Sequence, residues 1–405
     1  MSTRQLPRWS QLRESIRFRP LTLDPVARRL ERALTVTDLR EVARRTSPRS
    51  VFDYTDGAAG TESTLHRARD TFASLELRPS VLRDVSELDT STTVLGGPAA
   101  LPLVFGPTGF TRLMHHEGEL AVARVAERQG VPYCLATLGT TSIERVADAV
   151  PSGRRWFQLY VWRDRSRAEE LMRRAEASGY EALVLTVDVP VVGARHRDVR
   201  NGFTIPPTLT GRTMLNAARH PGWWVNLLTT EPLTFASLSS WDTDAQAIDE
   251  LLDPSMTIDD LEWIRAHWHG PLVVKGIQTV EDARRVVAAG ADAIVVSSHG
   301  GRQLDQAPVP LRLLPDVRDA LGGGTEVLLD TGVMSGTDVV AALALGADAV
   351  LVGRAYLYGL MAGGQRGVER MMTILTAETR RTMALLGVRT VAELGPQHVR
   401  LAPER

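Results

Sequence analysis

Polar side chains and glycines follow short apolar runs of strand length at one position after another. In chain order they are Gln158, Tyr160, Thr186, Asp188, Arg195, Lys275, His299, Arg302, Asp330, Gly332, Gly353 and Arg354. A histidine with a carboxylate suits a general base and its orienting partner, and arginine suits a carboxylate or phosphate. Each residue alone has an ordinary structural explanation. Their recurrence at successive strand ends predicts an active site.

Lys275, in LVVKG, is the only lysine of the chain. The sequence contains 47 Lys plus Arg, so 47 − 1 = 46 of the basic residues are arginine. An ammonium is a compact point charge, whereas a guanidinium is a bulky planar fork. A lysine that persists among arginines indicates a crowded polar site, with chance retention as the alternative.

The elements that must position these residues alternate from about residue 100 onward. The apolar runs are LPLVFG (101–106), PYCLAT (132–137), WFQLYV (156–161), ALVLTVD (182–188), LVVKG (272–276), AIVVSSHG (293–300), VLLDTG (327–332) and AVLVGR (349–354). Such segments are typical of parallel strands buried on both faces. Patterns such as GELAVARVAERQG and TVEDARRVVAAG predict helices between them. Eight β-then-α units predict a (β/α)8 TIM barrel, with a doubly wound open sheet as the alternative.

Two regions fall outside the eight units. Residues 1–99 predict an N-terminal helical extension or cap, and residues 100–400 form the barrel. Within the barrel, residues 202–258 separate the fourth and fifth strands. They include HPGWWVNLL and are too long for an ordinary connection, which predicts a lid or insertion.

Composition narrows the class of protein. A formal net charge of −1 gives no case for nucleic-acid binding. The single cysteine, Cys134, excludes an internal disulfide framework and a cysteine-rich metal site, and fits a reducing compartment. The N-terminus lacks the apolar core of a secretory signal, and no run is long enough to span a bilayer.

The last two strands carry a more specific signal. GVMSGTDVVAALALGA places a glycine-containing turn before a helix, and VLVGRAY places Gly353 and Arg354 after the final strand. This corner of a TIM barrel is the usual phosphate site, because helix N-terminal amides and an arginine fork suit an anion. A phosphorylated ligand is predicted, with packing glycines as the alternative.

The segment SSHGGRQLD (297–305), together with VVKG and LVGRA, resembles the FMN-dependent α-hydroxy-acid oxidoreductases. The resemblance runs from about residue 35 to residue 400. GARHRD and HPGWWVNLL are most similar to the bacterial L-lactate dehydrogenases that pass electrons to quinone. The resemblance implies FMN as cofactor, a 2-hydroxy acid as substrate, no metal, and a homotetramer.

The resemblance also implies roles for individual residues. His299 looks like the base, Asp188 its hydrogen-bond partner, and Lys275 the cation beside the flavin where negative charge develops. Substrate contacts are implied for Tyr54, Tyr160, Arg195 and Arg302. Flavin-ring contacts are implied for Thr108, Gly109, Gln158 and Thr186. Ribityl and phosphate contacts are implied for Asp330, Gly332, Gly353 and Arg354.

Four positions depart from the family pattern. Ser298 stands in place of asparagine, Ala136 in place of a serine that commonly faces the flavin, and Met334 in place of an arginine near the phosphate. Leu138 stands where glycolate oxidases carry an aromatic residue, which argues against glycolate. These departures bear on substrate and electron acceptor more than on reaction class.

The leading hypothesis is FMN-dependent oxidation of an L-2-hydroxy acid, L-lactate first, to the 2-oxo acid, with quinone or another acceptor. Within the class, an O2-using oxidase or a mandelate-type dehydrogenase is the alternative. A different class is a Schiff-base aldolase with Lys275 as nucleophile, and a third is a barrel that binds a phosphorylated ligand without turnover. A cytoplasmic protein is expected, with peripheral contact at the inner face of the cell membrane as a further option.

Overall fold

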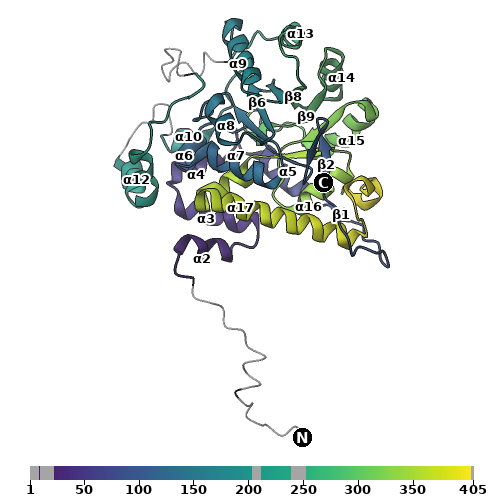
Figure 1. Ribbon diagram of the computed structural model, residues 1–405, viewed down its shortest axis with the longest axis horizontal. Coiled ribbons are helices and arrows are strands. Elements are labelled where there is room, and N and C mark those ends of the chain that lie inside the picture. The colour runs from purple at the N-terminus through teal and green to yellow at the C-terminus, as the bar shows by residue number, and fades with distance from the viewer. Residues whose placement is uncertain (1–8, 10–21, 203–210, 239–251, 403–405) are drawn as a thin grey trace.

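The computed structural model describes residue 9 and residues 22–202, 211–238 and 252–402 (Figure 1). Eight parallel strands close into a barrel in the order β10-β11-β4-β5-β6-β7-β8-β9. The strands are β4 (Leu103–Phe105), β5 (Tyr133–Ala136), β6 (Arg155–Leu159), β7 (Ala182–Thr186), β8 (Leu272–Ile277), β9 (Ala293–Val296), β10 (Glu326–Leu329) and β11 (Ala349–Val352). Each predicted apolar run overlaps one of them. The predicted TIM barrel is therefore confirmed, and the open sheet is wrong.

A helix follows each strand and covers the outside of the barrel. In the order of the strands these are α7 (Gly118–Gln129), α8 (Ile143–Ala149), α9 (Arg165–Ala177), α13 (Ile258–His267), α14 (Val280–Ala288), α15 (Pro310–Leu321), α16 (Gly336–Ala344) and α17 (Arg354–Leu386). Local signals set several ends. Thr279 and Ser335 cap α14 and α16 with their side-chain oxygens, and α7 ends at Gly130 in the left-handed conformation.

The barrel interior is filled by side chains, and a hairpin closes its N-terminal end. Inward-facing residues such as Val104, Trp156 and Val273 form a buried cluster that also includes Val94 and Ala99. The last two belong to the hairpin of β2 (Thr92–Val94) and β3 (Gly97–Ala99). No pattern that we recognised in the sequence predicts that this hairpin closes the barrel. With one end closed, ligands reach the barrel from the other.

The N-terminal extension is helical, as predicted, up to residue 73. It contains α2 (Pro25–Arg32), α3 (Val36–Thr46), α4 (Arg49–Asp56) and α5 (Ser63–Ala73), followed by β1 (Glu76–Leu77), which pairs with β12 (Val399–Arg400). In Figure 1, α3 lies along α17, with which it packs. Helix α4 carries Tyr54, and α5 packs against the turn that carries His299. Residues 1–8 and 10–21 of the predicted extension lie outside the described residues.

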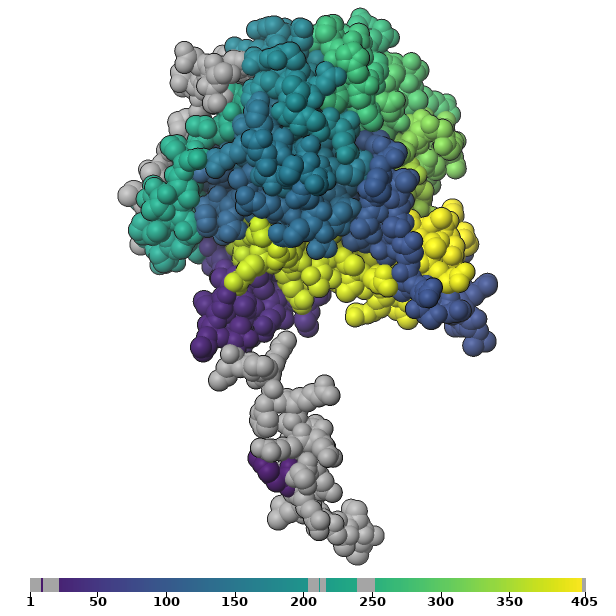
Figure 2. Space-filling model, in the orientation of Figure 1, coloured from purple at the N-terminus to yellow at the C-terminus, as the bar shows by residue number. Residues whose placement is uncertain are grey.

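The segment between β7 and α13 holds α10 (His196–Arg200), α11 (Gly211–Ala218) and α12 (Pro221–Thr229). Figure 2 shows that the teal part around α12 stands out from the barrel. Two contacts anchor it to the loop after β4: the indole Nε1 of Trp223 donates to the Leu113 carbonyl at 2.9 Å, and Arg112 donates to the Glu231 carbonyl at 2.5 Å. Residues 203–210 and 239–251 of the predicted insertion lie outside the described residues.

A membrane-crossing helix is not found among the described residues, because none is both long and apolar enough.

Candidate active site

His299 and Asp188 form a hydrogen-bonded pair at the C-terminal ends of β9 and β7. Nδ1 of His299 lies 2.9 Å from Oδ1 of Asp188. His299 opens the 3-10 turn η2 (His299–Gly301) and is held at φ 55°, a left-handed conformation that only a strongly constrained non-glycine residue adopts. Thr331 supplies that constraint, since its Oγ1 accepts the Ser298 and Gly300 N–H groups at 3.2 and 3.1 Å. The imidazole is therefore fixed with Nε2 left for a ligand.

Burial and charge set the protonation state of this pair. Burial lowers the pKa of His299 below its ordinary value, although the Asp188 carboxylate opposes the shift. Burial also pushes the pKa of Asp188 upward, but His299 and Lys275 outweigh it, so that pKa lies below its ordinary value. The pair rests as a neutral imidazole beside a carboxylate, the state in which histidine accepts a proton.

Two arginines and two tyrosines lie on the same side of the barrel mouth, the open end formed by the C-terminal ends of the strands. The guanidinium of Arg302 lies 4.8 Å from the centroid of the Tyr54 ring, and that of Arg195 lies 6.0 Å from it. Burial and the nearby charge of Arg195 lower the pKa of Arg302 to about 9. Tyr160 joins this group, because the charges of Asp188 and Arg195 both act on its hydroxyl. A partly buried pair of positive charges favours an anionic ligand.

Lys275 belongs to a second polar cluster deeper in the barrel. Its Nζ lies 3.2 Å from both Oδ2 of Asp330 and Oγ of Ser297, and Ser297 donates to the same carboxylate oxygen at 2.7 Å. Ser297 also accepts the His299 N–H at 3.0 Å. Burial lowers the pKa of Lys275, but Asp330 and Asp188 outweigh it and raise that pKa above its ordinary value. Lys275 is therefore an ammonium.

Four buried polar atoms at the mouth lack a hydrogen-bond partner within the described part of the chain. They are Nε2 of Gln158, Oγ1 of Thr186, Oδ2 of Asp188 and Nε of Arg195. Buried polar atoms are nearly always paired in folded proteins, and each unpaired one costs about 1 to 3 kcal/mol. Their clustering at one place indicates a polar ligand.

The ends of β10 and β11 form the predicted phosphate corner. Gly332 is left-handed at φ 94°, and a Cβ there would lie 3.1 Å from the Phe72 ring. Arg354 donates to three backbone carbonyls, those of Thr55, Gly57 and Gly300, at 2.9, 2.7 and 2.8 Å. A guanidinium has five N–H donors, so these bonds leave two for another acceptor. The sequence analysis did not predict this structural role of Arg354, which joins the N-terminal extension to the barrel.

The remaining predicted cofactor residues lie on the loop after β4. Oγ1 of Thr108 is 2.6 Å from the Tyr356 hydroxyl. A Cβ on Gly109 would lie 3.2 Å from that of Leu138, which explains the small residue there. Ser298 is one of the residues that depart from the family pattern, and its Oγ lies 3.3 Å from Oγ1 of Thr331. Near Met334, Arg69 of α5 contacts the Gly332 carbonyl and pairs with Asp338 at 2.7 Å.

The structure thus brings together every residue predicted for the base, the cation and the substrate carboxylate. It adds three to which the sequence analysis assigned no role: Ser297, Thr331 and Arg69. Ser297 could have been predicted from the sequence, since it is a polar residue directly after the apolar run AIVV. Arg69 could not, because a lone arginine on an amphipathic helix is usually solvated.

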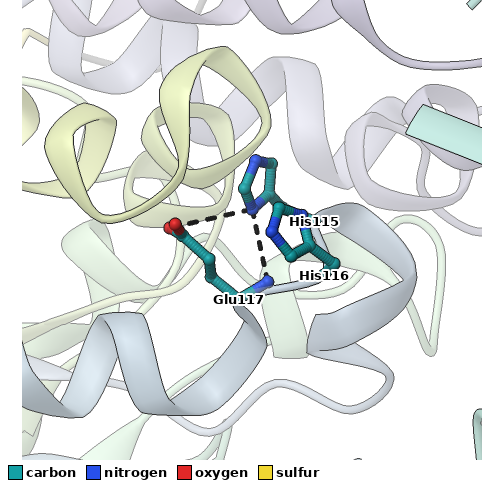
Figure 3. Close-up of side chains that lie close together, drawn as sticks. All are labelled: His115, His116 and Glu117. Atoms are coloured by element: carbon teal, nitrogen blue, oxygen red, sulfur yellow. Dashed lines mark hydrogen bonds and ion pairs between the residues drawn. The ribbon is translucent and has the colours of Figure 1, made fainter. Parts of the chain in front are cut away.

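A separate group, His115, His116 and Glu117, has its potential metal-ligand atoms within 4.8 Å of one another (Figure 3). Two of these atoms already have partners: Nδ1 of His115 accepts the Glu117 N–H at 3.4 Å, and the Glu117 carboxylate accepts the Gln365 N–H at 2.6 Å. The centroids of the two imidazole rings are 4.4 Å apart, and the ring planes are tilted by 32°. Because imidazole lone pairs lie in the ring plane, rings that lie over one another in this way converge poorly on one ion. We assign this group to the start of α7.

Residues 43–401 match the model of a family described as "FMN-dependent dehydrogenase". A protein of Mycobacterium tuberculosis named "Putative L-lactate dehydrogenase" is 55% identical over 397 residues, which cover 98% of this chain and 96% of the relative. An L-lactate dehydrogenase of Caulobacter vibrioides is 44% identical over 370 residues, covering 89% and 96%.

Solved structures agree with the family match. The monotopic membrane protein (S)-mandelate dehydrogenase superposes with a TM-score of 0.88 at 37% identity, covering 91% of this chain and 99% of the other. A mandelate oxidase superposes with a TM-score of 0.78 at 41% identity, covering 91% and 100%.

Proposed function

Because the chain belongs to the FMN-dependent dehydrogenase family, we propose that it oxidises an L-2-hydroxy acid, L-lactate first, to the 2-oxo acid. One observation carries the proposal: the neutral His299, oriented by Asp188, shares the barrel mouth with the partly buried cations Arg195 and Arg302. A 2-hydroxy acid has a carboxylate for the cations and a proton for the base. Its acceptor is proposed to be a quinone.

FMN is the cofactor, and the residues present fit it. The unpaired Gln158 and Thr186 atoms suit the polar edge of the flavin ring, next to Thr108 and Gly109. Gly332, Gly353, Asp330 and two free donors of Arg354 suit the ribityl chain and phosphate. When bound, FMN supplies a two-electron acceptor.

The chain's own residues then supply binding, orientation and proton transfer. The forks of Arg195 and Arg302 hold the substrate carboxylate, and the Tyr54 and Tyr160 hydroxyls orient the substrate from the same side. Nε2 of His299 takes the proton that leaves the substrate, and Asp188 stabilises the imidazolium that forms. Hydride and carbanion routes use the same residues.

Lys275 provides a fixed positive charge, and Asp330 and Ser297 hold its ammonium in place. A preorganised cation of this kind stabilises negative charge as it develops. The same charge state argues against a Schiff-base aldolase. An amine nucleophile must be neutral, whereas the carboxylates around Lys275 raise its pKa.

The decisive experiment is the visible spectrum of the FMN-loaded protein, recorded anaerobically before and after L-lactate. Bleaching by L-lactate supports the proposal, and the rate of recolouring in air separates an oxidase from a dehydrogenase. His299→Gln, which keeps a polar group of similar size, should bleach about 10³-fold more slowly. A wild-type spectrum that ignores every 2-hydroxy acid tested would overturn the proposal, and bleaching by (S)-mandelate alone would move the substrate.

The outer side of α12 bears on the location and assembly of the protein. We propose a cytoplasmic homotetramer with peripheral contact at the inner membrane face. The support is the outer side of α12, where Trp224, Val225 and Leu228 are 37%, 41% and 74% exposed. Exposed apolar residues with an indole suit an interface. Co-sedimentation with anionic lipid vesicles tests the membrane contact, and a Leu228→Glu variant that still sediments equally would refute it.

A further inference from the structure

We infer that three aromatic residues, Tyr54, Phe110 and Phe235, form a wall that limits the size of the substrate side chain. This aromatic wall joins the N-terminal extension, the loop after β4 and the inserted segment after β7. The inference rests on the proposed function for the identity of the substrate class. It assigns to the inserted segment a direct part in substrate selection.

The three rings contact one another in sequence. The centroids of Tyr54 and Phe110 lie 6.4 Å apart with their planes at 87°, and those of Phe110 and Phe235 lie 4.6 Å apart at 67°. Edge-to-face contacts of this kind hold aromatic rings in defined orientations. All three side chains are only partly buried and pack against the main core. They therefore keep apolar surface available.

Phe110 is held in place by its backbone. It adopts φ 55° and ψ 32°, a left-handed conformation that is unusual for a bulky residue. Its N–H donates to the Leu138 carbonyl at 3.0 Å, which links it to the loop after β5. Because strained residues persist only where their surroundings determine them, the ring position is fixed rather than adaptable.

Phe235 is held by the docking of the inserted segment. Arg112 donates to the Glu231 and Pro232 carbonyls, at 2.5 and 3.4 Å, and the Ala236 N–H donates to the Gly139 carbonyl at 3.2 Å. These contacts bracket Phe235 on both sides in sequence. The segment thus reaches the same two loops that carry Gly109 and Leu138.

The wall begins at Tyr54, beside the two cations, and extends from there through Phe110 to Phe235. Tyr54 lies beneath Arg302 and Arg195, which hold the carboxylate, and His299 takes the proton. The remaining substituent of the 2-hydroxy acid is its side chain, and an apolar group is most stable against apolar surface. Phe110 and Phe235 therefore favour a short aliphatic side chain over an aryl one.

The test compares L-lactate with (S)-mandelate in anaerobic flavin reduction. Phe235→Ala should raise the mandelate-to-lactate ratio of kcat/KM by about tenfold or more, since removing bulk from an apolar site changes selectivity on that scale. Phe110→Leu, which keeps much of the volume, should give a smaller shift in the same direction. A ratio that stays within about twofold of wild type in both variants would overturn the inference.

A matched control separates the wall from the docking of the segment. Trp223→Phe removes the indole hydrogen bond to Leu113 and leaves all three rings in place. It should leave the ratio unchanged. An equal shift in Trp223→Phe and Phe235→Ala would show that segment docking, rather than the wall, sets selectivity.

A binding measurement keeps this test independent of turnover. Propionate and phenylacetate lack the hydroxyl and are not oxidised, but their binding perturbs the flavin spectrum. Phe235→Ala should tighten phenylacetate relative to propionate. If wild-type protein oxidises no 2-hydroxy acid, the proposed function fails while the binding ratio still reports on the wall. Unchanged binding ratios with active enzyme would refute the wall alone.

Discussion

The two ends of the barrel each hold a partly buried arginine, and the two differ in what they bond. At the closed end, Arg154 pairs with Glu181 at 2.8 Å and donates to the Val94 and Gly97 carbonyls at 2.9 and 3.1 Å. At the open end, Arg302 donates to the Tyr54 and Gly57 carbonyls and stacks on Tyr54, with Arg195 nearby. The charge of Arg154 is neutralised by its neighbour Glu181, whereas Arg302 lies near the like charge of Arg195.

This difference separates stability from function within one barrel. The Arg154 contacts tie the plugging hairpin to β6, so they stabilise the fold. The Arg302 arrangement costs free energy in the absence of a ligand, because a buried cation without a counter-ion is unfavourable. His299 and Phe110, which lie at the open end, adopt left-handed backbone conformations. A carboxylate ligand would relieve the electrostatic cost.

Replacing each arginine by methionine, which is similar in length, is the strongest test of this difference between Arg154 and Arg302. Arg302→Met should lower kcat/KM about 100-fold, because a charge-assisted hydrogen bond to the substrate carboxylate is lost. The temperature of unfolding should hold or rise, provided that removing a partly buried charge outweighs loss of the bonds to the Tyr54 and Gly57 carbonyls. Stopped-flow flavin reduction and thermal denaturation measure the two effects. Loss of stability with full activity would contradict the assignment of Arg302.

The pH profile tests the open end directly, because two of its groups, His299 and Arg302, have shifted pKa values. Burial lowers the pKa of His299 below 6.5, and only its neutral form accepts a proton, so kcat/KM should fall tenfold per unit on the acidic side of that pKa. The pKa of Arg302 is about 9, and loss of its charge should produce a second decline above that pH. Arg302→Met should lack the basic decline. An acidic decline with its midpoint above pH 6.5 would contradict the assignment of His299, and a rate that stays constant well above pH 9 would contradict that of Arg302.

Arg154→Met should have the smallest effect on catalysis and the opposite effect on stability. It leaves backbone carbonyls of the hairpin without their donor, which should lower the free energy of unfolding by about 2 kcal/mol. Flavin reduction by L-lactate should stay within about twofold of wild type, measured at a temperature where both proteins are folded. A large loss of activity would mean that the closed end is coupled to the mouth.

Much of the barrel follows from the sequence because its strands are buried on both faces and read as unbroken apolar runs. The hairpin at residues 92–99 is different. TTVLGGPA is short, and only its packing beneath the barrel makes Val94 and Ala99 core residues. Its position depends on Arg154, which lies about 60 residues away in sequence. Contacts of that kind leave no local pattern.

The candidate site shows the same division. His299, Lys275 and Arg302 could be predicted because each ends or follows an apolar run and belongs to a matching motif. The bonds of Arg354 to carbonyls from α4 and η2 could not, since a glycine–arginine pair after a strand looks the same with or without them. Phe235 was also missed, because nothing within the insertion marks that residue as a neighbour of Phe110.

The single lysine has a practical consequence for following this protein in solution. Apart from nine imidazoles, every other basic side chain is a guanidinium, and the ammonium of Lys275 is enclosed, with only 5% of its side chain exposed. An amine-directed label applied to the folded protein should therefore attach to the chain's amino terminus alone, and a second label should appear only when the barrel opens. Label stoichiometry, read by mass spectrometry, would report opening at a residue that lies where the cofactor is expected to bind.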